Sequence, residues 1–429
     1  MKKKYRIILY TSIFLLCVVA SIILVVKKSN SVYEEESKPK VVKHKSMLSM
    51  NLEQTAGAGD YKTVTQSKWP TEGYKFNAEL SRCENGSTLS WDDTKKAVIV
   101  SGNLSDKCYV YFDIYQPTLA EYIKSQYTGT QGENNIYYHD SDLANGAGDN
   151  SYRYAGANPN NFVCFGSDTS PCPTDNLYRI IGVFGENYHG VTGKQLVKLI
   201  KYDYMTTDEL GTDGDYSQTY KEWGMDNTYK GTYGDGERIG VYYWNYKATG
   251  SATNTWSTSL LNKTNLNTNF INNIGTTWAN KIATVTWKVG GNTWANIGTK
   301  TSSVAYTNEI TNPVTTNTTD NATTYSAKIG LMYVSDYGFA ASPDAWTLTM
   351  SSYNNTTATN NNWMYMGLYE WTISRNADYS DSAFGVSSDG GVLYNNVNFN
   401  RGVRASFNLE SSVSYVSGSG SMSDPIVIN

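Results

Sequence analysis

Short runs of β-branched and aromatic residues, separated by Gly, Asn and Asp, recur along most of the chain. This pattern is typical of β-strands joined by turns. Two runs, LYRIIGVF at 177–184 and LVKLIKYDY at 196–204, flank a glycine-containing loop, which predicts an antiparallel pair. Further strands are predicted at 97–100, 108–115, 328–334, 368–374, 383–387, 392–397 and 403–409.

Two segments follow a helical pattern instead. The run TLAEYIKSQY at 118–127 begins with Thr118 and Glu121 at the spacing of a capping box. At 257–274, leucine, isoleucine and phenylalanine recur at largely helical spacing. The Thr/Asn-rich stretch 298–326 predicts a long exposed loop. Strands and helices together predict an α+β fold built on a mixed, largely antiparallel sheet.

The N-terminal region has a different pattern. Residues 7–26 carry no charge and are long enough to cross a bilayer, which predicts a transmembrane helix after a cytoplasmic tail at 1–6. A cleaved signal peptide is the alternative, although its apolar core would usually be shorter. Residues 27–59 are charged and poor in aromatics, which favours a linker or stalk. A small β domain at 60–116 and a larger domain at 117–429 are predicted to follow.

The cysteines favour an oxidising compartment. Of five cysteines, Cys17 lies within the apolar run and the other four form two sequence-local pairs. We expect disulfides between Cys83 and Cys108 and between Cys164 and Cys172, although four reduced thiols are an alternative. Zinc is less favoured because neither pair has CxxC spacing. The prediction is therefore a single-pass protein of the cell membrane with an extracellular body.

Charge and composition exclude several classes of function. The formal net charge is −4, and residues 1–45 hold 10 Lys or Arg against 3 Glu, so the remaining body is acidic and nucleic acid is not an expected partner. Only 3 histidines occur, which leaves little material for imidazole catalysis or metal binding. The sequence therefore predicts a non-enzyme with no cofactor and no metal site.

The distal region resembles a known type of domain. The strings EWTISRNADYSDSAFGVSSDGG at 370–391 and NRGVRASFNL at 400–409 are similar to the end of a domain of unknown function in bacterial surface proteins. That pattern also resembles the C-type-lectin-like fold, which includes formylglycine-generating enzymes. Earlier blocks, NLYRIIGVF, WSTSL and KIGLMYVSDYGFAA, extend the resemblance over about residues 150–410. The resemblance implies a C-type-lectin-like module.

The chain departs from this fold where its members act chemically. Lectins of the fold that hold sugar through calcium carry Glu-Pro-Asn or Gln-Pro-Asp and Trp-Asn-Asp, none of which occurs here. The formylglycine-generating enzyme uses cysteines at its reaction centre, whereas the cysteines of this domain lie in the short 164–172 loop. Neither calcium-dependent sugar binding nor oxidase activity is therefore carried over.

Several polar groups could form a metal, catalytic or anion site, or could serve ordinary structural roles. His139 lies among Tyr137, Asp140, Asp142 and Asp149 and could serve a metal or acid/base role, but a solvated loop is favoured. Calcium at Asp378, Asp381 and Asp389 lacks EF-hand spacing. Three arginines are expected to brace strands rather than to bind anions: Arg375, Arg401 and Arg404.

The aromatic runs YYWNY at 242–246 and WMYMGLYEW at 363–371 have the composition of recognition surfaces, although strand core is favoured for the second. Because loops carry recognition, we nominate four residues around the last strands as a contact patch: Trp363, Tyr365, Asn376 and Asp378. The predicted function is non-catalytic recognition of a glycan or protein ligand, as in an adhesin. A pilin-like or envelope subunit is the alternative, and an enzyme of unknown reaction comes third.

Overall fold

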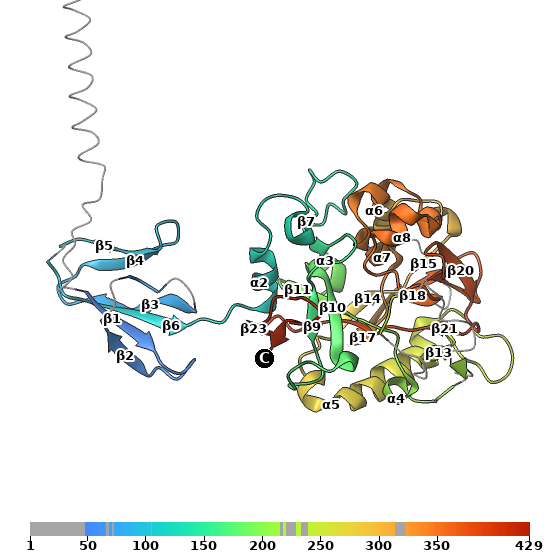
Figure 1. The fold of residues 1–429 in the computed structure, drawn as a ribbon, viewed down its shortest axis with the longest axis horizontal. Coiled ribbons are helices and arrows are strands. Elements are labelled where there is room, and N and C mark those ends of the chain that lie inside the picture. Colours follow the sequence, from blue (N-terminus) through green and yellow to red (C-terminus); the bar gives the residue numbers. More distant parts are fainter. Residues whose placement is uncertain are drawn as a thin grey trace, which may run out of the picture. The chain divides into compact units, whose positions relative to one another are not determined.

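The computed structural model describes the chain from Leu48 onward with short gaps, and it divides the protein into two compact units (Figure 1). The units are Met1–Tyr115 and Gln116–Asn429. The described residues are 48–65, 68–70, 73–103, 105–214, 218–219, 229–232, 239–313 and 323–429. The tail at 1–6 and the apolar run at 7–26 lie outside them. Within the described ranges, no helix is both long and apolar enough to cross a membrane.

The first unit is a small β structure. Its sheet has the order β2 (Tyr61–Val64), β1 (Leu48–Glu53), β6 (Cys108–Ile114) and β3 (Tyr74–Cys83), with β1 parallel to β6. A separate hairpin joins β4 (Thr88–Asp92) to β5 (Ala97–Ser101). The core surrounds Phe112, whose ring has three aromatic neighbours, Trp69, Phe76 and Trp91. Strand β1 lies within 27–59, so regular structure begins inside the stretch predicted as a linker.

The first sheet of the second unit has six strands in the order β17, β22, β11, β10, β8, β7, and a seventh strand, β9, also pairs with β10. The bounds are β7 (Ile136–Tyr138), β8 (Tyr152–Tyr154), β9 (Phe162–Cys164), β10 (Leu177–Phe184), β11 (Leu196–Lys201), β17 (Ile329–Gly330) and β22 (Ser406–Asn408). The predicted antiparallel pairing of the central strands is confirmed, since Phe184 lies opposite Leu196. All eight residues of β10 are buried, so both faces of this strand are covered.

The second sheet lies in the C-terminal half of the same unit. Its order is β12 (Gln218–Thr219), β13 (Gly240–Tyr242), β21 (Arg401–Gly402), β18 (Glu370–Asn376), β19 (Ser382–Val386) and β20 (Val392–Asn396), and β15 (Gly291–Asn292) runs parallel beside β18. Two small pairs complete the strands: β14 (Val285–Lys288) with β16 (Thr324–Ala327), and β23 (Tyr415–Ser417) with β24 (Val427–Ile428).

The predicted α+β class is wrong, because the described chain is mostly β-sheet with few helices, none of which could span a membrane. The α-helices are α2 (Leu119–Ser125), α3 (Glu186–His189), α4 (Thr207–Leu210), α5 (Ile271–Ala279), α6 (Ser302–Tyr306), α7 (Val334–Ala340) and α8 (Thr356–Asn360). Short 3-10 turns and two π-helical stretches, η5 (Leu261–Phe270) and η7 (Thr307–Thr311), add to these. The abundant β-branched and aromatic residues favour strands, which explains the balance.

The structure confirms the predicted capping box and differs from the prediction in three other segments. The capping box of α2 is confirmed, with Glu121 N donating to Thr118 Oγ1 at 3.2 Å. The helix predicted at 257–274 is π-helical over much of its length and continues through α5. The strand predicted at 328–334 is reduced to β17, because Val334 begins α7. The loop predicted at 298–326 contains α6 and η7, and residues 314–322 lie outside the description.

Both predicted disulfides are confirmed. Cys83 and Cys108 lie directly opposite each other on β3 and β6 in the first unit. Cys164 and Cys172 close a loop with a sequence separation of 8 in the second unit. Each bridge restricts the unfolded chain, so the two units carry one covalent staple each.

Candidate functional site

Two of the four nominated contact residues are part of the core. Trp363 is 3% exposed, and its Nε1 donates to the Tyr154 carbonyl at 2.8 Å. Tyr365 is 5% exposed, and its hydroxyl donates to the Ser388 carbonyl at 2.6 Å. The expectation that these rings face solvent is wrong, because each polar atom bonds to a backbone carbonyl while the ring is enclosed by protein.

The other two nominated residues differ from each other. Asn376 is fully buried, and its Oδ1 accepts the Asp378 backbone N–H at 2.8 Å. Asp378 itself is exposed. The four residues therefore do not form one surface patch, and only Asp378 reaches solvent.

The exposed Tyr379, which follows Asp378, and two partly buried rings form an aromatic cluster that we call the ring platform: Trp294, Tyr379 and Tyr394. Tyr379 is 51% exposed and stacks on Tyr394 with centroids 5.5 Å apart and planes at 16°. Trp294 meets the edge of Tyr394 at 5.6 Å and 62°. Burial and then a hydrogen bond with Tyr379 raise the pKa of Tyr394. The platform thus presents ring faces and phenolic hydroxyls together.

The loop that carries Tyr379 is anchored from beneath by Asn254. This asparagine is fully buried, and its Nδ2 lies within hydrogen-bond distance of the carbonyls of Asn376, Tyr379 and Ser382. Its backbone N–H also donates to the Ser380 carbonyl at 2.7 Å. Because the loop is fixed before any ligand arrives, its ring would lose little entropy on binding.

A charged residue adjoins the ring platform, because the exposed Asp378 precedes Tyr379 in the same loop. Asp381 Oδ2 accepts from Asn396 Nδ2 at 2.9 Å, which ties the loop to the strand. Sequence reasoning missed this site because Trp294, in η6 (Trp294–Asn296), lies far along the chain from the loop and β20 that carry the other two rings.

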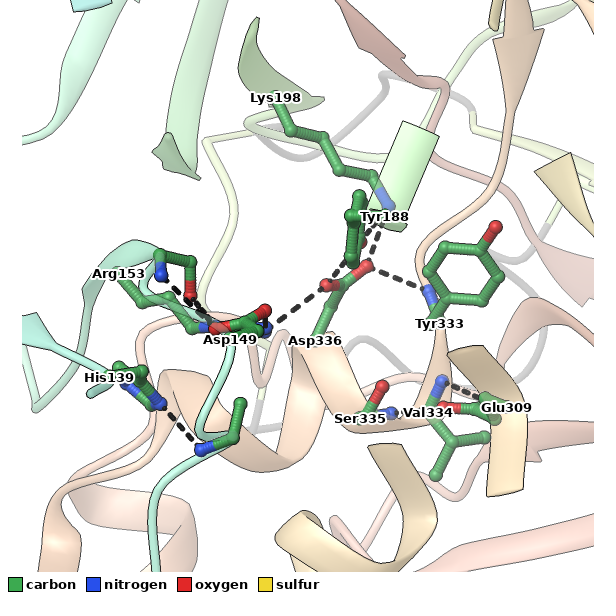
Figure 2. Close-up of polar contacts among 12 residues, drawn as sticks. His139, Asp149, Arg153, Tyr188, Lys198, Glu309, Tyr333, Val334, Ser335 and Asp336 are labelled. Atoms are coloured by element: carbon green, nitrogen blue, oxygen red, sulfur yellow. Dashed lines mark hydrogen bonds and ion pairs between the residues drawn. The ribbon is translucent and has the colours of Figure 1, made fainter. Parts of the chain in front are cut away.

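A buried network of charged and hydroxyl groups is the second feature of this unit (Figure 2). Arg153 donates to Asp149 at 2.7 Å and lies 3.9 Å from Asp336. Lys198 Nζ lies 2.7 Å from Asp336 Oδ2, and both side chains are fully buried. Alternating charges therefore run from Asp149 through Arg153 and Asp336 to Lys198, and each charge offsets the desolvation of its neighbour.

Glu309 joins this network at the start of α7. Its two carboxyl oxygens accept the backbone N–H groups of Val334 at 3.0 Å and Ser335 at 2.8 Å, and Ser374 Oγ also bonds to it. Burial raises the pKa of Glu309, while these hydrogen bonds act against that rise. The sequence signal for this role, a lone glutamate in a Thr/Asn-rich stretch, was too weak to find.

His139 is buried rather than solvated. Its Nδ1 accepts the Ala147 N–H at 3.0 Å, and its ring packs against Phe339 and Trp346. Burial, and after it the charge of Arg153, lowers the pKa of His139 well below its usual range. Asp140 caps a turn through the N–H groups of Asp142 and Leu143. Among the described residues, no group of His, Cys, Asp or Glu is placed to hold a metal ion.

The three arginines that were expected to brace strands are used differently. Arg404 forms a two-point contact with Glu370 at 2.7 and 2.8 Å, which confirms bracing at this position. Arg401 lies over the ring of Tyr369 at 4.3 Å. Arg375 pairs with no carboxylate among the described residues, and burial lowers its pKa. Among the described residues, bracing by an ion pair is therefore seen at Arg404 and not at Arg375.

Comparison with known proteins adds no relative. No protein-family model matches the chain, and neither a curated protein nor a solved structure matches it significantly. The resemblance to a C-type-lectin-like module stays a prediction, and the residues themselves carry the functional argument.

Proposed function

We propose that this protein is an exported, non-catalytic recognition protein that binds a glycan through the ring platform. The observation that carries the proposal is the exposed ring of Tyr379, which stacks on the partly buried Tyr394 with Trp294 at its edge. A sugar ring has an apolar C–H face that packs on an aromatic ring. Its hydroxyl edge needs hydrogen-bond partners, and the carboxylate of Asp378 can supply acceptors. The platform offers both kinds of contact side by side.

Two further observations support this proposal. The disulfides Cys83–Cys108 and Cys164–Cys172 are typical of proteins that fold in an oxidising compartment, which supports an extracellular body. The ionisable groups of the buried network are enclosed and paired, so a substrate in solvent would not reach them. Their enclosure supports recognition rather than catalysis.

A glycan array probed with the full chain tests the proposal. Tyr379→Ala should weaken binding to any retained glycan at least tenfold, about 1.4 kcal/mol, because the stacking face is lost. Tyr379→Phe should keep most of the affinity, and Asp378→Asn should change which glycans are retained. Tyr109→Ala, a half-buried tyrosine of the first unit, is the matched control. No glycan bound by the wild type, or equal binding by Tyr379→Ala, would refute the proposal.

A further inference from the structure

Lys198 and Asp336 meet in an unusual setting. Lys198 lies on β11 and Asp336 on α7, at a sequence separation of 138. Nζ lies 2.7 Å from Oδ2, and both side chains are fully buried. An amine and a carboxyl group at this distance can in principle condense to an amide bond, with release of one water molecule.

A third group connects the two. Lys198 Nζ donates to the Tyr188 hydroxyl at 2.6 Å, and that hydroxyl donates to Asp336 Oδ1 at 2.6 Å (Figure 2). The second oxygen, Oδ2, accepts the Tyr333 backbone N–H at 2.9 Å. One carboxyl oxygen is therefore placed to receive protons from the amine through Tyr188, while the other is held by a fixed donor.

The surroundings exclude water. Nζ of Lys198 lies 4.4 Å from the ring centre of Tyr333, 4.8 Å from that of Tyr188 and 4.9 Å from that of Trp287. Burial lowers the pKa of Lys198, although the charge of Asp336 opposes this shift. A buried lysine is more easily converted to the neutral amine, which is the nucleophilic form.

We propose that Lys198 and Asp336 condense to an intramolecular amide bond that links β11 to α7. Tyr188 first passes a proton from Nζ to Oδ1, which leaves a neutral amine and a carboxylic acid. Nζ then forms a bond to Cγ, a second proton follows the same route, and the bond between Cγ and Oδ1 breaks to release water. Oδ2 remains as the amide oxygen, with the Tyr333 N–H stabilising the negative charge that develops on it. No oxidant or cofactor is needed.

The same strand provides an internal comparison. Lys201 Nζ also lies 2.7 Å from a carboxyl oxygen, that of Glu209. The Glu209 side chain is 14% exposed, and its Oε2 accepts from the Thr206 N–H at 2.9 Å. Solvent reaches this carboxylate and stabilises the ion pair. Lys201 should therefore remain unlinked.

Intact mass spectrometry of the full chain, unfolded and with its disulfides reduced, tests the proposal. The wild type should be lighter than its sequence by one water molecule, and protease digestion should yield one linked peptide pair containing Lys198 and Asp336. Lys198→Arg should restore the sequence mass. In Asp336→Asn the condensation should release ammonia instead of water, because the leaving group is then the side-chain amide nitrogen.

Two mass-spectrometry results would contradict the proposal. Folded wild-type protein with the unmodified sequence mass would overturn the proposal and leave an ordinary buried ion pair. Loss of water that maps to Lys201 and Glu209 would overturn it as well. Tyr188→Phe should slow bond formation, so freshly folded protein should contain a larger unlinked fraction than the wild type.

Discussion

Charged side chains are usually exposed and aromatic side chains usually buried, and the second unit departs from this in two places. The buried network encloses charged groups, with Asp336 between Arg153 and Lys198. The ring platform exposes aromatic groups, with Tyr379 at its surface. A buried charge is tolerated only when a partner compensates it, whereas an exposed ring is tolerated singly and often marks a contact site. The comparison teaches that the charged groups of this unit are enclosed with partners, whereas the proposed binding function would use other residues at the surface.

Removing Asp336 should be among the most destabilising changes. Asp336→Ala removes the acceptor that Lys198 and Tyr188 share in a dry site, and with it the proposed amide bond. We expect a loss of about 3 to 5 kcal/mol in the free energy of unfolding, measured by urea denaturation. Asp344→Ala, an exposed aspartate beyond α7, is the control and should change little. A small effect of Asp336→Ala would show that the network contributes little to stability.

The short disulfide should come next. Replacing both Cys164 and Cys172 by serine opens the loop that they close in the second unit. The free energy of unfolding should fall by about 2 to 3 kcal/mol, because the unfolded chain gains freedom. Denaturation followed by the fluorescence of the second unit's tryptophans would measure this. Binding by the ring platform should survive at temperatures where the variant stays folded, which separates the two features further.

A pH dependence should follow from His139. The folded pKa lies well below that of the unfolded chain, so the neutral form is favoured by folding. Stability from this group is complete above about pH 6.5 and falls as pH drops below that value, by about 1.4 kcal/mol per pH unit until the folded pKa is reached.

The measurement is urea denaturation at pH 7.5, 6.5 and 5.5 with the wild type and His139→Asn. Burial raises the pKa of Glu309 and Glu370, so these two carboxyl groups increase stability as pH falls, whereas His139 decreases it. The difference between wild type and variant therefore isolates His139. Parallel pH curves for the two proteins would contradict the assignment.

Changes at the ring platform should have the smallest effect on stability. Tyr379→Ala removes a ring that is half in solvent, so we expect the free energy of unfolding to stay within about 0.5 kcal/mol of the wild type. Tyr365→Ala removes an enclosed ring and should cost roughly 3 to 5 kcal/mol. If thermal denaturation ranked the two variants the other way, the division between core and surface rings would be wrong.

Much of the local structure could be predicted because its causes are local. The strands at 177–184 and 196–204, the capping box at Thr118 and both disulfides depend on composition and short spacing. The fold class could not be predicted in the same way. The helical periodicity at 257–274 gave only the presence of a helical segment, not its π-helical form, and strand β17 is shortened by the capping contact between Tyr333 and Asp336.

The sequence by itself determined where the central pair of strands and the covalent links form, since β-branched residues and cysteine spacing act within short stretches. Only the tertiary structure decided which aromatic and charged groups face solvent. In β10 and β18 every residue is buried, so alternation along the strand does not distinguish core from surface. Tyr365 and Tyr379 look alike in sequence, and Lys198 and Lys201 lie on one strand. Their environments differ because segments more than a hundred residues away enclose one member of each pair and leave solvent near the other.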